Sequence, residues 1–160
     1  MKISIIAALS QNFVIGKNNQ IPWYLPQDLS WFKYHTLHKT IIMGRLTWNS
    51  LAVPLPMRNN IVISKTKIKS KTIIWANSIS QALLFAKKLN KEVMIIGGGT
   101  LYLQTIQYAN QLYLTHIHKH IIGDVYFPKY HINLWKRTFY QIMYSTQINN
   151  YYSFEILKRK

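Results

Sequence analysis

Short apolar runs recur along the chain, and this feature constrains the fold more than any other. Several of them are apolar at consecutive positions, which is typical of central strands in a sheet that helices cover on both faces. The runs cover residues 3–9, 40–43, 60–64, 72–75, 93–96 and 111–117. The sequence therefore predicts a strand at each of these places, in a mainly parallel sheet.

Helical patterns lie between those runs. The clearest spans Ser78–Leu89, where apolar residues repeat at helical spacing and the first residue forms a capping-box signature with Gln81. Another begins at Pro26, a residue that suits the first helical turn. From Trp135 on, the pattern indicates two further strands joined near Asn149. This order favours an α/β domain whose mainly parallel sheet has an antiparallel edge.

The charge of the chain is strongly basic. It has 160 residues, with 20 Lys+Arg against 4 Asp+Glu and a formal net charge of +16. Such a balance is typical of proteins that bind nucleic acid or another polyanion. Apart from an alternating run at residues 65–71 and the last three residues, however, the basic side chains are dispersed. We therefore expect a solvated basic surface, with nucleic acid not the main partner.

The composition also limits where in the cell the protein can act and which metal sites it can form. The chain has no cysteine, which excludes disulfides and thiolate metal sites. No apolar run reaches the ~20 residues of a membrane span, and residues 1–9 lead into a strand pattern rather than a signal peptide. We expect one cytoplasmic domain over residues 1–160, without a metal site and without a membrane anchor.

Any carboxylate chemistry must use one of four side chains, Asp28, Glu92, Asp124 or Glu155. Asp28 lies in the first turn of the helix that begins at Pro26, where it could simply complement the helix dipole. Its neighbours along the chain are largely aromatic or aliphatic, so a buried carboxylate there would need a strongly donating partner. A heterocycle edge with two parallel N–H donors would suit it. Both interpretations stay open on the residues alone.

Three glycines follow the apolar run at 93–96. They are Gly97, Gly98 and Gly99, and the stretch Thr100–Ile106 after them has a helical pattern. Glycine lets a backbone approach a ligand closely, and a helix start offers free N–H groups to phosphates. The segment is neither G-x-G-x-x-G nor a P-loop. It could cradle a diphosphate, or it could be a tight turn.

The run at 40–43 repeats this design with Gly44, Arg45 and Thr47. The ends of parallel strands meet at one edge of a sheet, where α/β folds bind ligands. An arginine at that edge suits a phosphate monoester, which favours NADP over NAD. Taken alone, Arg45 could equally be a surface arginine.

Taken together, these motifs resemble the bacterial dihydrofolate reductase family over essentially the whole chain. The matching segments, in order, are Ile6-Ala7-Ala8, Ile15-Gly16, Ile21-Pro22-Trp23, Leu25-Pro26-x-Asp28, Ile42-Met43-Gly44-Arg45-x-Thr47-Trp48, Leu55-Pro56-x-Arg58, Ile96-Gly97-Gly98-Gly99, Leu112-Tyr113-Leu114-Thr115-His116-Ile117 and Phe154-Glu155-Ile156-Leu157. Their joint order and spacing are specific, although each motif by itself is weak.

The resemblance implies a fold, an activity and a set of partners. The fold is a single domain with a central eight-stranded, mostly parallel sheet, an antiparallel C-terminal strand and about four flanking helices. The activity is NADPH-dependent reduction of dihydrofolate to tetrahydrofolate, which supports one-carbon metabolism. We expect a monomer without an obligate protein partner that diaminopyrimidine and pteridine antifolates bind.

The same resemblance implies roles for individual residues. Asp28 would grip the pterin ring, supported by Thr115 and, through water, by Trp23, with Tyr102 beside them. Arg58 would pair with the glutamate carboxylate of the substrate. The implied substrate positions are Ile6, Ala8, Asp28, Leu29, Phe32, Lys33, Leu51, Leu55, Arg58, Ile96 and Thr115. The implied NADPH positions are Ala8, Ile15, Gly16, Asn19, Ile21, Gly44, Arg45, Leu46, Thr47, Ser64, Lys65, Ile96, Gly98, Gly99, Thr100, Leu101, Tyr102 and Gln104. Residues 16–23 would form a loop over the nicotinamide, supported by Gly123 and Asp124.

Three positions depart from the family pattern. Leu46 and Thr100 stand where relatives often carry basic residues, which leaves more of the phosphate selectivity to Arg45, with Lys65 able to compensate. Met57 replaces a glycine before Arg58, which would alter the turn that directs this arginine. Three alternative functions remain open: the pyrimidine reductase of riboflavin synthesis, a basic nucleic-acid-binding protein and an inactive relative. Asp28 and Arg58 favour folate because they match the two ends of that substrate.

Overall fold

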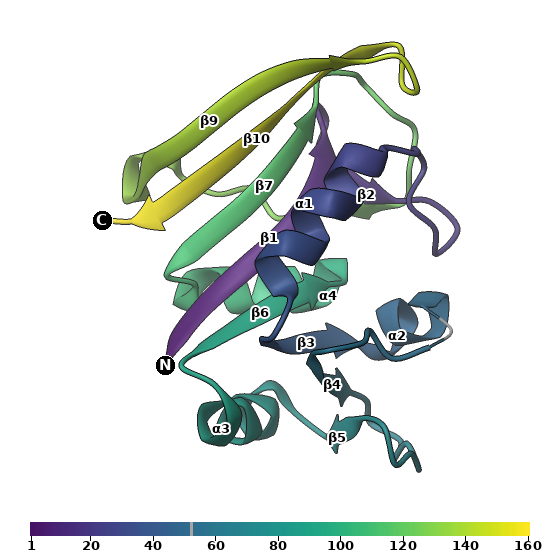
Figure 1. Cartoon of the computed structure of the whole chain (residues 1–160), viewed down its shortest axis with the longest axis vertical. Helices are drawn as coiled ribbons and strands as arrows, with labels where there is room; N and C mark the ends of the chain where they lie inside the picture. Colours follow the sequence, from purple (N-terminus) through teal and green to yellow (C-terminus); the bar gives the residue numbers. More distant parts are fainter. Residues whose placement is uncertain (52) are drawn as a thin grey trace.

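The computed structural model describes residues 1–51 and 53–160 and centres on an eight-stranded sheet (Figure 1). The strand order is β5-β4-β3-β6-β1-β7-β10-β9, and only β10 runs against the others. The strands are β1 (Lys2–Ser10), β3 (Thr40–Gly44), β4 (Asn59–Ile63), β5 (Ile74–Ala76), β6 (Glu92–Gly97), β7 (Gln111–Ile117), β9 (Trp135–Ser145) and β10 (Asn150–Arg159). The mostly parallel sheet with an antiparallel C-terminal strand is confirmed. The predicted antiparallel edge is wrong, because β10 lies between β7 and the edge strand β9, which runs parallel to the rest.

Four α-helices cover the two faces of this sheet. They are α1 (Pro26–Thr36), α2 (Arg45–Leu51), α3 (Ile79–Leu89) and α4 (Gly99–Thr105), with short 3-10 turns η1 (Ile106–Tyr108) and η2 (Ile132–Leu134). The first two pack on the core around Ile6, Ile41 and Met94, and the other two on the core around Ile5 and Ile95. Adjacent residues of the central strands thus enter opposite cores, which explains why these runs are apolar at consecutive positions.

The helix boundaries follow local capping chemistry. The predicted cap of α3 is confirmed, because the Ser78 hydroxyl accepts a 3.2 Å hydrogen bond from the Gln81 N–H. The returning Gln81 side chain accepts from the N–H of Asn77 rather than Ser78. The helix predicted over Thr100–Ile106 instead begins one residue earlier, at Gly99, and ends in a 3-10 turn.

The strand predicted over 72–75 is displaced toward the C-terminus. β5 spans Ile74–Ala76, where the carbonyl of Ala76 accepts a hydrogen bond from the N–H of Ser64. The indole N–H of Trp75 donates to the carbonyl of Ser64 at 3.0 Å, which fixes the same register from the side chain. The apolar pattern of the sequence does not reveal this side-chain contact, so the pattern alone could not place the strand.

A second, two-stranded sheet was not predicted. It pairs β2 (Val14–Gly16) with β8 (Val125–Tyr126), and both strands are too short for a pattern. Gly123 fits closely against this pair, since a Cβ on it would lie 2.3 Å from Val14 Cγ1. The small sheet joins the segment before α1 to the segment after β7.

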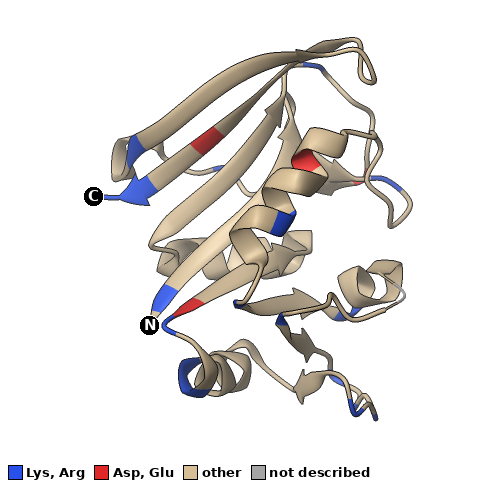
Figure 2. Ribbon diagram, viewed as in Figure 1, with Lys and Arg blue, Asp and Glu red and all other residues tan. Residues whose placement is uncertain are grey.

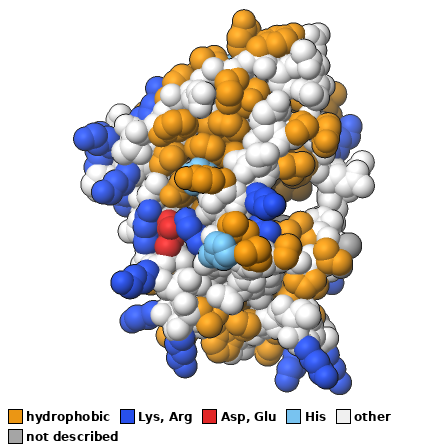
Figure 3. Space-filling model, in the orientation of Figure 1, with side chains coloured by type: hydrophobic (Ala, Val, Ile, Leu, Met, Phe, Trp, Pro, Cys, Tyr) orange, Lys and Arg blue, Asp and Glu red, His pale blue; other side chains and the backbone are white. Residues whose placement is uncertain are grey.

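The basic side chains are spread over the molecule. Figure 2 shows Lys and Arg on loops, strand ends and helix surfaces, and Figure 3 shows them mostly around the periphery of one face. Two of the four acids are paired: Glu92 with Lys2 and Lys39, and Glu155 with Arg137 and His116. Across residues 1–51 and 53–160, no helix is long and apolar enough to cross a membrane.

Candidate active site

A hydrogen bond between α1 and β7 forms the centre of the site. Thr115 Oγ1 donates to Asp28 Oδ1 at 2.6 Å, and Thr115 itself is buried. Burial raises the pKa of the Asp28 carboxyl from 3.8 to about 6, while the hydrogen bond from Thr115 acts in the opposite direction. The result is a desolvated carboxylate with one protein donor and unused acceptor capacity.

This geometry separates the two interpretations of Asp28. The N-cap residue of α1 is Leu25, which makes no side-chain cap, and Pro26 begins the helix. Asp28 lies in the first turn, yet its carboxylate contacts the sheet rather than only the helix end. The side chain therefore does more than complement the helix dipole.

Aromatic stacking fixes α1 against the sheet at this point. Trp31, one helical turn after Asp28, stacks on Phe154 with ring centroids 4.3 Å apart and planes 7° apart. Phe154 is the cross-strand partner of Thr115 in β10. The stack therefore holds the helix directly over the strand pair that carries the Thr115 hydroxyl. The sequence predicted an aromatic surround, but not this stacking partner.

Tyr102 contributes a buried hydroxyl from α4. Its Oη donates to the carbonyl of Ile6 at 2.8 Å, and the side chain is 4% exposed. Burial, and secondarily the charge of Asp28, raise the pKa of the Tyr102 phenol well above its usual value of 10. Tyr102 therefore stays protonated and holds the Ile6 carbonyl at the centre of the sheet.

The ends of β3 and β6 meet as the sequence predicts. Met43 pairs with Gly97, and a Cβ on Gly44 would lie 3.8 Å from the Gly97 carbonyl oxygen. Gly97 has φ 141°, and a Cβ there would lie 3.0 Å from Thr47 Oγ1. The peptide bond between Gly97 and Gly98 is cis. The positive φ of Gly97 and its closeness to Thr47 both favour glycine at this position.

Gly99 is equally constrained from the other side. A Cβ on it would lie 2.8 Å from Val125 Cγ1 and 3.2 Å from the Tyr126 carbonyl oxygen. The glycine segment is thus enclosed by α2 on one side and by β8 on the other.

The predicted phosphate-binding side chains lie at the same sheet edge. Arg45 opens α2 directly after β3, and Lys65 follows β4, the neighbouring parallel strand. Both are exposed, whereas Ser64 is buried. Leu46 and Thr100 are exposed as well, so the two lost basic positions face solvent.

Arg58 lies at the far end of α1 from Asp28. Its Nη1 donates to Thr36 Oγ1 at 3.0 Å and its Nε to the Pro56 carbonyl at 2.9 Å. Thr36 is fully buried, and its own hydroxyl donates to the Phe32 carbonyl at 2.7 Å. Burial lowers the pKa of the Arg58 guanidinium. From Asp28 to Thr36 the helix axis advances about 12 Å, which separates the carboxylate from the arginine along α1.

Met57 adopts a backbone conformation that favours glycine. Its φ is 57°, in the left-handed region, and its side chain is exposed. The carbonyl of Met57 accepts from the N–H of His38, which keeps the turn closed before Arg58.

The segment between β2 and α1 is fastened at several points. The Asn18 N–H donates to Asp124 Oδ2 at 2.9 Å, and Lys17 and Gln20 exchange backbone hydrogen bonds. The Asn19 side-chain amide reaches the Leu46 carbonyl at 3.5 Å, next to Arg45. Asp124 thus supports this segment as expected, by accepting from its backbone.

The remaining predicted residues divide by exposure. Ile6, Ile96, Leu101 and Tyr102 are buried; Ala8, Ile15, Phe32, Leu51 and Leu55 are half-buried; Ile21, Leu29, Lys33 and Gln104 are exposed. Sequence reasoning missed Thr36 and Phe154. The sequence offered only a threonine between Phe32 and Leu37 of the predicted helix as a signal for Thr36, and Phe154 was named only as part of a motif.

Comparisons with known proteins agree with this geometry. The family model described as dihydrofolate reductase matches residues 2–159. The chain is 56% identical to the dihydrofolate reductase of Buchnera aphidicola subsp. Acyrthosiphon pisum, over 99% of this chain and 100% of that protein. It is 42% identical to the Haemophilus influenzae enzyme, over the full length of both.

A solved structure has the same fold. Dihydrofolate reductase from Enterococcus faecalis, complexed with NADP(H) and RAB-propyl, is 29% identical and superposes with a TM-score of 0.91, covering 99% of this chain and 96% of that one. The family model spans nearly the whole chain, and the relatives align end to end. The chain therefore belongs to the dihydrofolate reductase family.

Proposed function

We propose that the chain catalyses the reduction of 7,8-dihydrofolate to 5,6,7,8-tetrahydrofolate by NADPH, with Asp28 as the residue that binds and orients the pterin. The observation that carries these roles is the pair of Asp28 and Thr115. Thr115 engages only Oδ1 in its 2.6 Å hydrogen bond, which leaves carboxylate lone pairs for the pterin N3 and 2-amino donors. Family membership supports the reaction, and this pair supports the assignment of the carboxylate.

The residues at the ends of β3 and β6 fit a dinucleotide. At Gly98 a Cβ would meet only Thr47 Oγ1, at 3.5 Å, and the backbone of this glycine is therefore the part of the segment that a diphosphate could approach closely. Arg45 at the start of α2 is the cation for the 2′-phosphate, with Lys65 on the neighbouring strand end. NADPH, when bound, supplies the hydride that pterin C6 receives.

Protonation of pterin N5 needs a second route. Asp28 lies at the N3 side of the ring in this assignment, so we give it an orienting and electrostatic role, with water as the proton carrier. The indole N–H of Trp23 is buried and has no hydrogen-bond partner within residues 1–51 and 53–160. It is therefore available to hold a water molecule between the indole and the substrate, which is the role implied for Trp23.

Arg58 completes the substrate site from the other end of α1. Thr36 and the Pro56 carbonyl hold its guanidinium in one orientation, with donors left over for a carboxylate. Leu29, Leu51 and Leu55 form the walls between the two ends. This division of the site explains recognition of a molecule with an N–H edge at one end and a carboxylate at the other.

Four further properties belong to the proposal. The chain acts as one domain over residues 1–160, as a monomer, in the cytoplasm and without nucleic acid as a main partner. The dispersed Lys and Arg side chains support the last of these. Light scattering on the purified protein should give a mass near 18.9 kDa. A mass of twice that value would contradict the monomer.

Steady-state turnover tests the proposed reaction. NADPH oxidation should depend on added dihydrofolate and scale with enzyme concentration, while the ribosylaminopyrimidine substrate of riboflavin synthesis should give none. Retention of RNA at ~200 mM salt would point instead to nucleic-acid binding, because phosphate contacts alone are strongly salt-sensitive. No dihydrofolate-dependent oxidation would end the proposal.

A further inference from the structure

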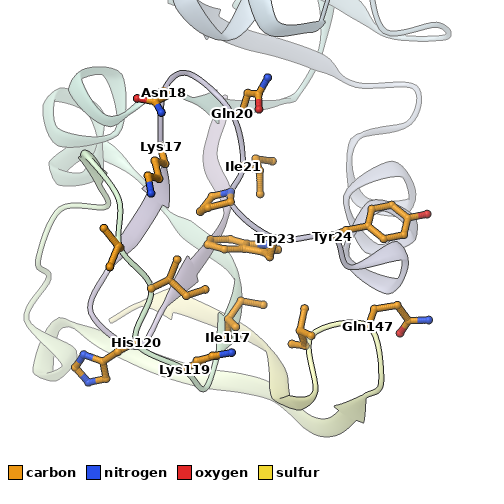
Figure 4. Close-up of a pocket in the computed structure, with 14 residues that line it drawn as sticks. Lys17, Asn18, Gln20, Ile21, Trp23, Tyr24, Ile117, Lys119, His120 and Gln147 are labelled. Carbon is orange, nitrogen blue, oxygen red and sulfur yellow. The ribbon is translucent and has the colours of Figure 1, made fainter.

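A pocket of about 730 Å³ lies beside the segment that precedes α1, and Asp28 is not among the residues that line it. Three segments form it: residues 17–24, residues 117–122 at the end of β7 and after it, and residues 147–148 in the β9–β10 turn (Figure 4). This volume is within the range of small-molecule sites. Trp23 and Ile21 have roles in the proposed active site, but none of those roles explains the rest of this lining.

The lining has an apolar floor. Trp23, Ile117, Ile121 and Ile148 line the pocket and belong to one apolar cluster with Leu25. Figure 4 shows the Trp23 indole in the middle of the lining. A flat aromatic ring is a good partner for a second ring, by offset stacking or edge contact.

The polar part of the lining includes two lysines. Lys17, Lys119 and His120 line the pocket, together with uncharged Asn18 and Gln147. No acid is among the lining residues. The acid that contacts this segment, Asp124, accepts the Asn18 N–H and does not line the pocket. The chain has a net charge of +16, and none of the described lining residues carries a carboxylate that would repel an anion in this pocket.

We propose that this pocket binds a small aromatic anion, an aryl carboxylate or sulfonate, with its ring against Trp23 and its charge toward Lys119 and Lys17. Two lysines separated by an apolar floor suit a ligand with one flat apolar body and one anionic group. A cationic ligand would face the two lysines, and a neutral one would leave the charges unused.

Occupancy of the pocket is coupled to the active site through the apolar cluster. Trp23 lies five residues before Asp28, and Leu25 between them is 3% exposed in the same cluster. Phe154 also belongs to this cluster and is the cross-strand partner of Thr115. A ligand that contacts Trp23 therefore changes the side-chain packing that positions Asp28 next to Thr115. This consequence rests on the proposed function, whereas binding itself does not.

Binding is tested with 2-naphthoate by ¹⁵N NMR, on the complex with saturating NADP⁺ and folate so that the substrate site is filled. The Trp23 indole signal and the amides of Lys119 and Ile121 should shift on titration. Lys119→Glu should weaken binding about tenfold, because it replaces an ion pair by a like-charge contact. The matched control is Lys88→Glu, an exposed lysine on α3 that should leave the affinity unchanged.

Two more measurements make the test specific. The neutral 2-naphthamide should bind about tenfold more weakly than the carboxylate, and Gln147→Glu, which places a carboxylate in the lining without changing its size, should weaken binding of the carboxylate. Equal affinity for both ligands, equal affinity in wild type and Lys119→Glu, or no shifts at Trp23 would each overturn the proposal. Because the readout is binding, absence of reductase activity would be a separate result.

The kinetic consequence is measured afterwards on the wild type. We expect 2-naphthoate to lower kcat at saturating dihydrofolate, with an inhibition constant that rises in Lys119→Glu and not in Lys88→Glu. Purely competitive inhibition against dihydrofolate would overturn the coupling.

Discussion

Thr115 and Asp28, 87 positions apart in the chain, are joined by a 2.6 Å hydrogen bond in which the threonine hydroxyl is the donor. This contact fixes the carboxylate to the central sheet rather than leaving it to the mobility of a helix end. It also opposes desolvation, since it stabilises the ionised form of a carboxyl group whose pKa is raised to about 6.

Removing that donor should raise the Asp28 pKa further. In Thr115→Val, desolvation stays and the hydrogen bond to the ionised form is lost. A hydrogen bond to a charged group is worth roughly 1.5–3 kcal/mol, so the midpoint should rise by about one unit or more. The midpoint of the pH–rate profile for hydride transfer reports it. Thr115→Ser, which keeps the hydroxyl, should stay close to wild type; an equal midpoint in all three would remove the role of Thr115.

The buried carboxylate should also cost stability at neutral pH. Its folded pKa, about 6, lies above the ordinary 3.8, so the folded state holds the proton more tightly than the unfolded chain. Stability from this group is complete below about pH 4 and is lost as the pH rises through 6, by at most about 3 kcal/mol. Asp28→Asn should therefore raise the urea midpoint at pH 8 relative to wild type and have little effect at pH 4. An equal difference at both values would contradict this linkage.

The sheet could be predicted from the sequence because its central strands are buried on both faces. Residues 111–117 were predicted as a strand with the boundaries that β7 has, because Leu112 and Leu114 enter one core and Tyr113 enters the other. The pairing of β2 with β8 could not be predicted, because strands of three and two residues are too short to show the alternation of apolar and polar residues that marks a strand.

The site was predictable in its residues but not in its contacts. Asp28 and Thr115 were both expected, on the resemblance rather than on spacing. The link from Thr36 to Arg58, and the stack of Trp31 on Phe154, depend on how a helix lies across a sheet. Local sequence does not encode that placement, because it follows from packing of distant segments.

Arg45 should decide the choice between the two nicotinamide dinucleotides. Loss of a charge-assisted contact to the 2′-phosphate costs roughly 1.5–3 kcal/mol, or about tenfold or more in KM. We expect Arg45→Ala to raise the KM for NADPH by this factor and leave the KM for NADH nearly unchanged. Steady-state assays with both cofactors measure it, with Lys88→Ala on α3 as the control. Equal effects on the two cofactors would exclude Arg45 from phosphate recognition.

Thr36 should act as a positioning residue for Arg58. Thr36→Val removes the acceptor for Arg58 Nη1 and keeps the buried shape of the side chain. The KM for dihydrofolate should rise about fivefold or more, as for one lost hydrogen bond to a charged group, with kcat little changed. A dihydropterin substrate that lacks the glutamate should show no difference between wild type and variant. A similar loss with both substrates would indicate a general structural effect.

The central claim is that the Asp28 carboxylate binds and orients the pterin, and the most direct measurement is kcat/KM for dihydrofolate in wild type, Asp28→Asn and Asp28→Glu. Asparagine keeps the size and loses the charge, so we expect kcat/KM to fall by about a hundredfold or more, the loss expected for a charge-assisted bidentate pair. Glutamate keeps the carboxylate and should retain much more activity than asparagine. Undiminished kcat/KM in Asp28→Asn, with the fold intact by circular dichroism, would contradict the account.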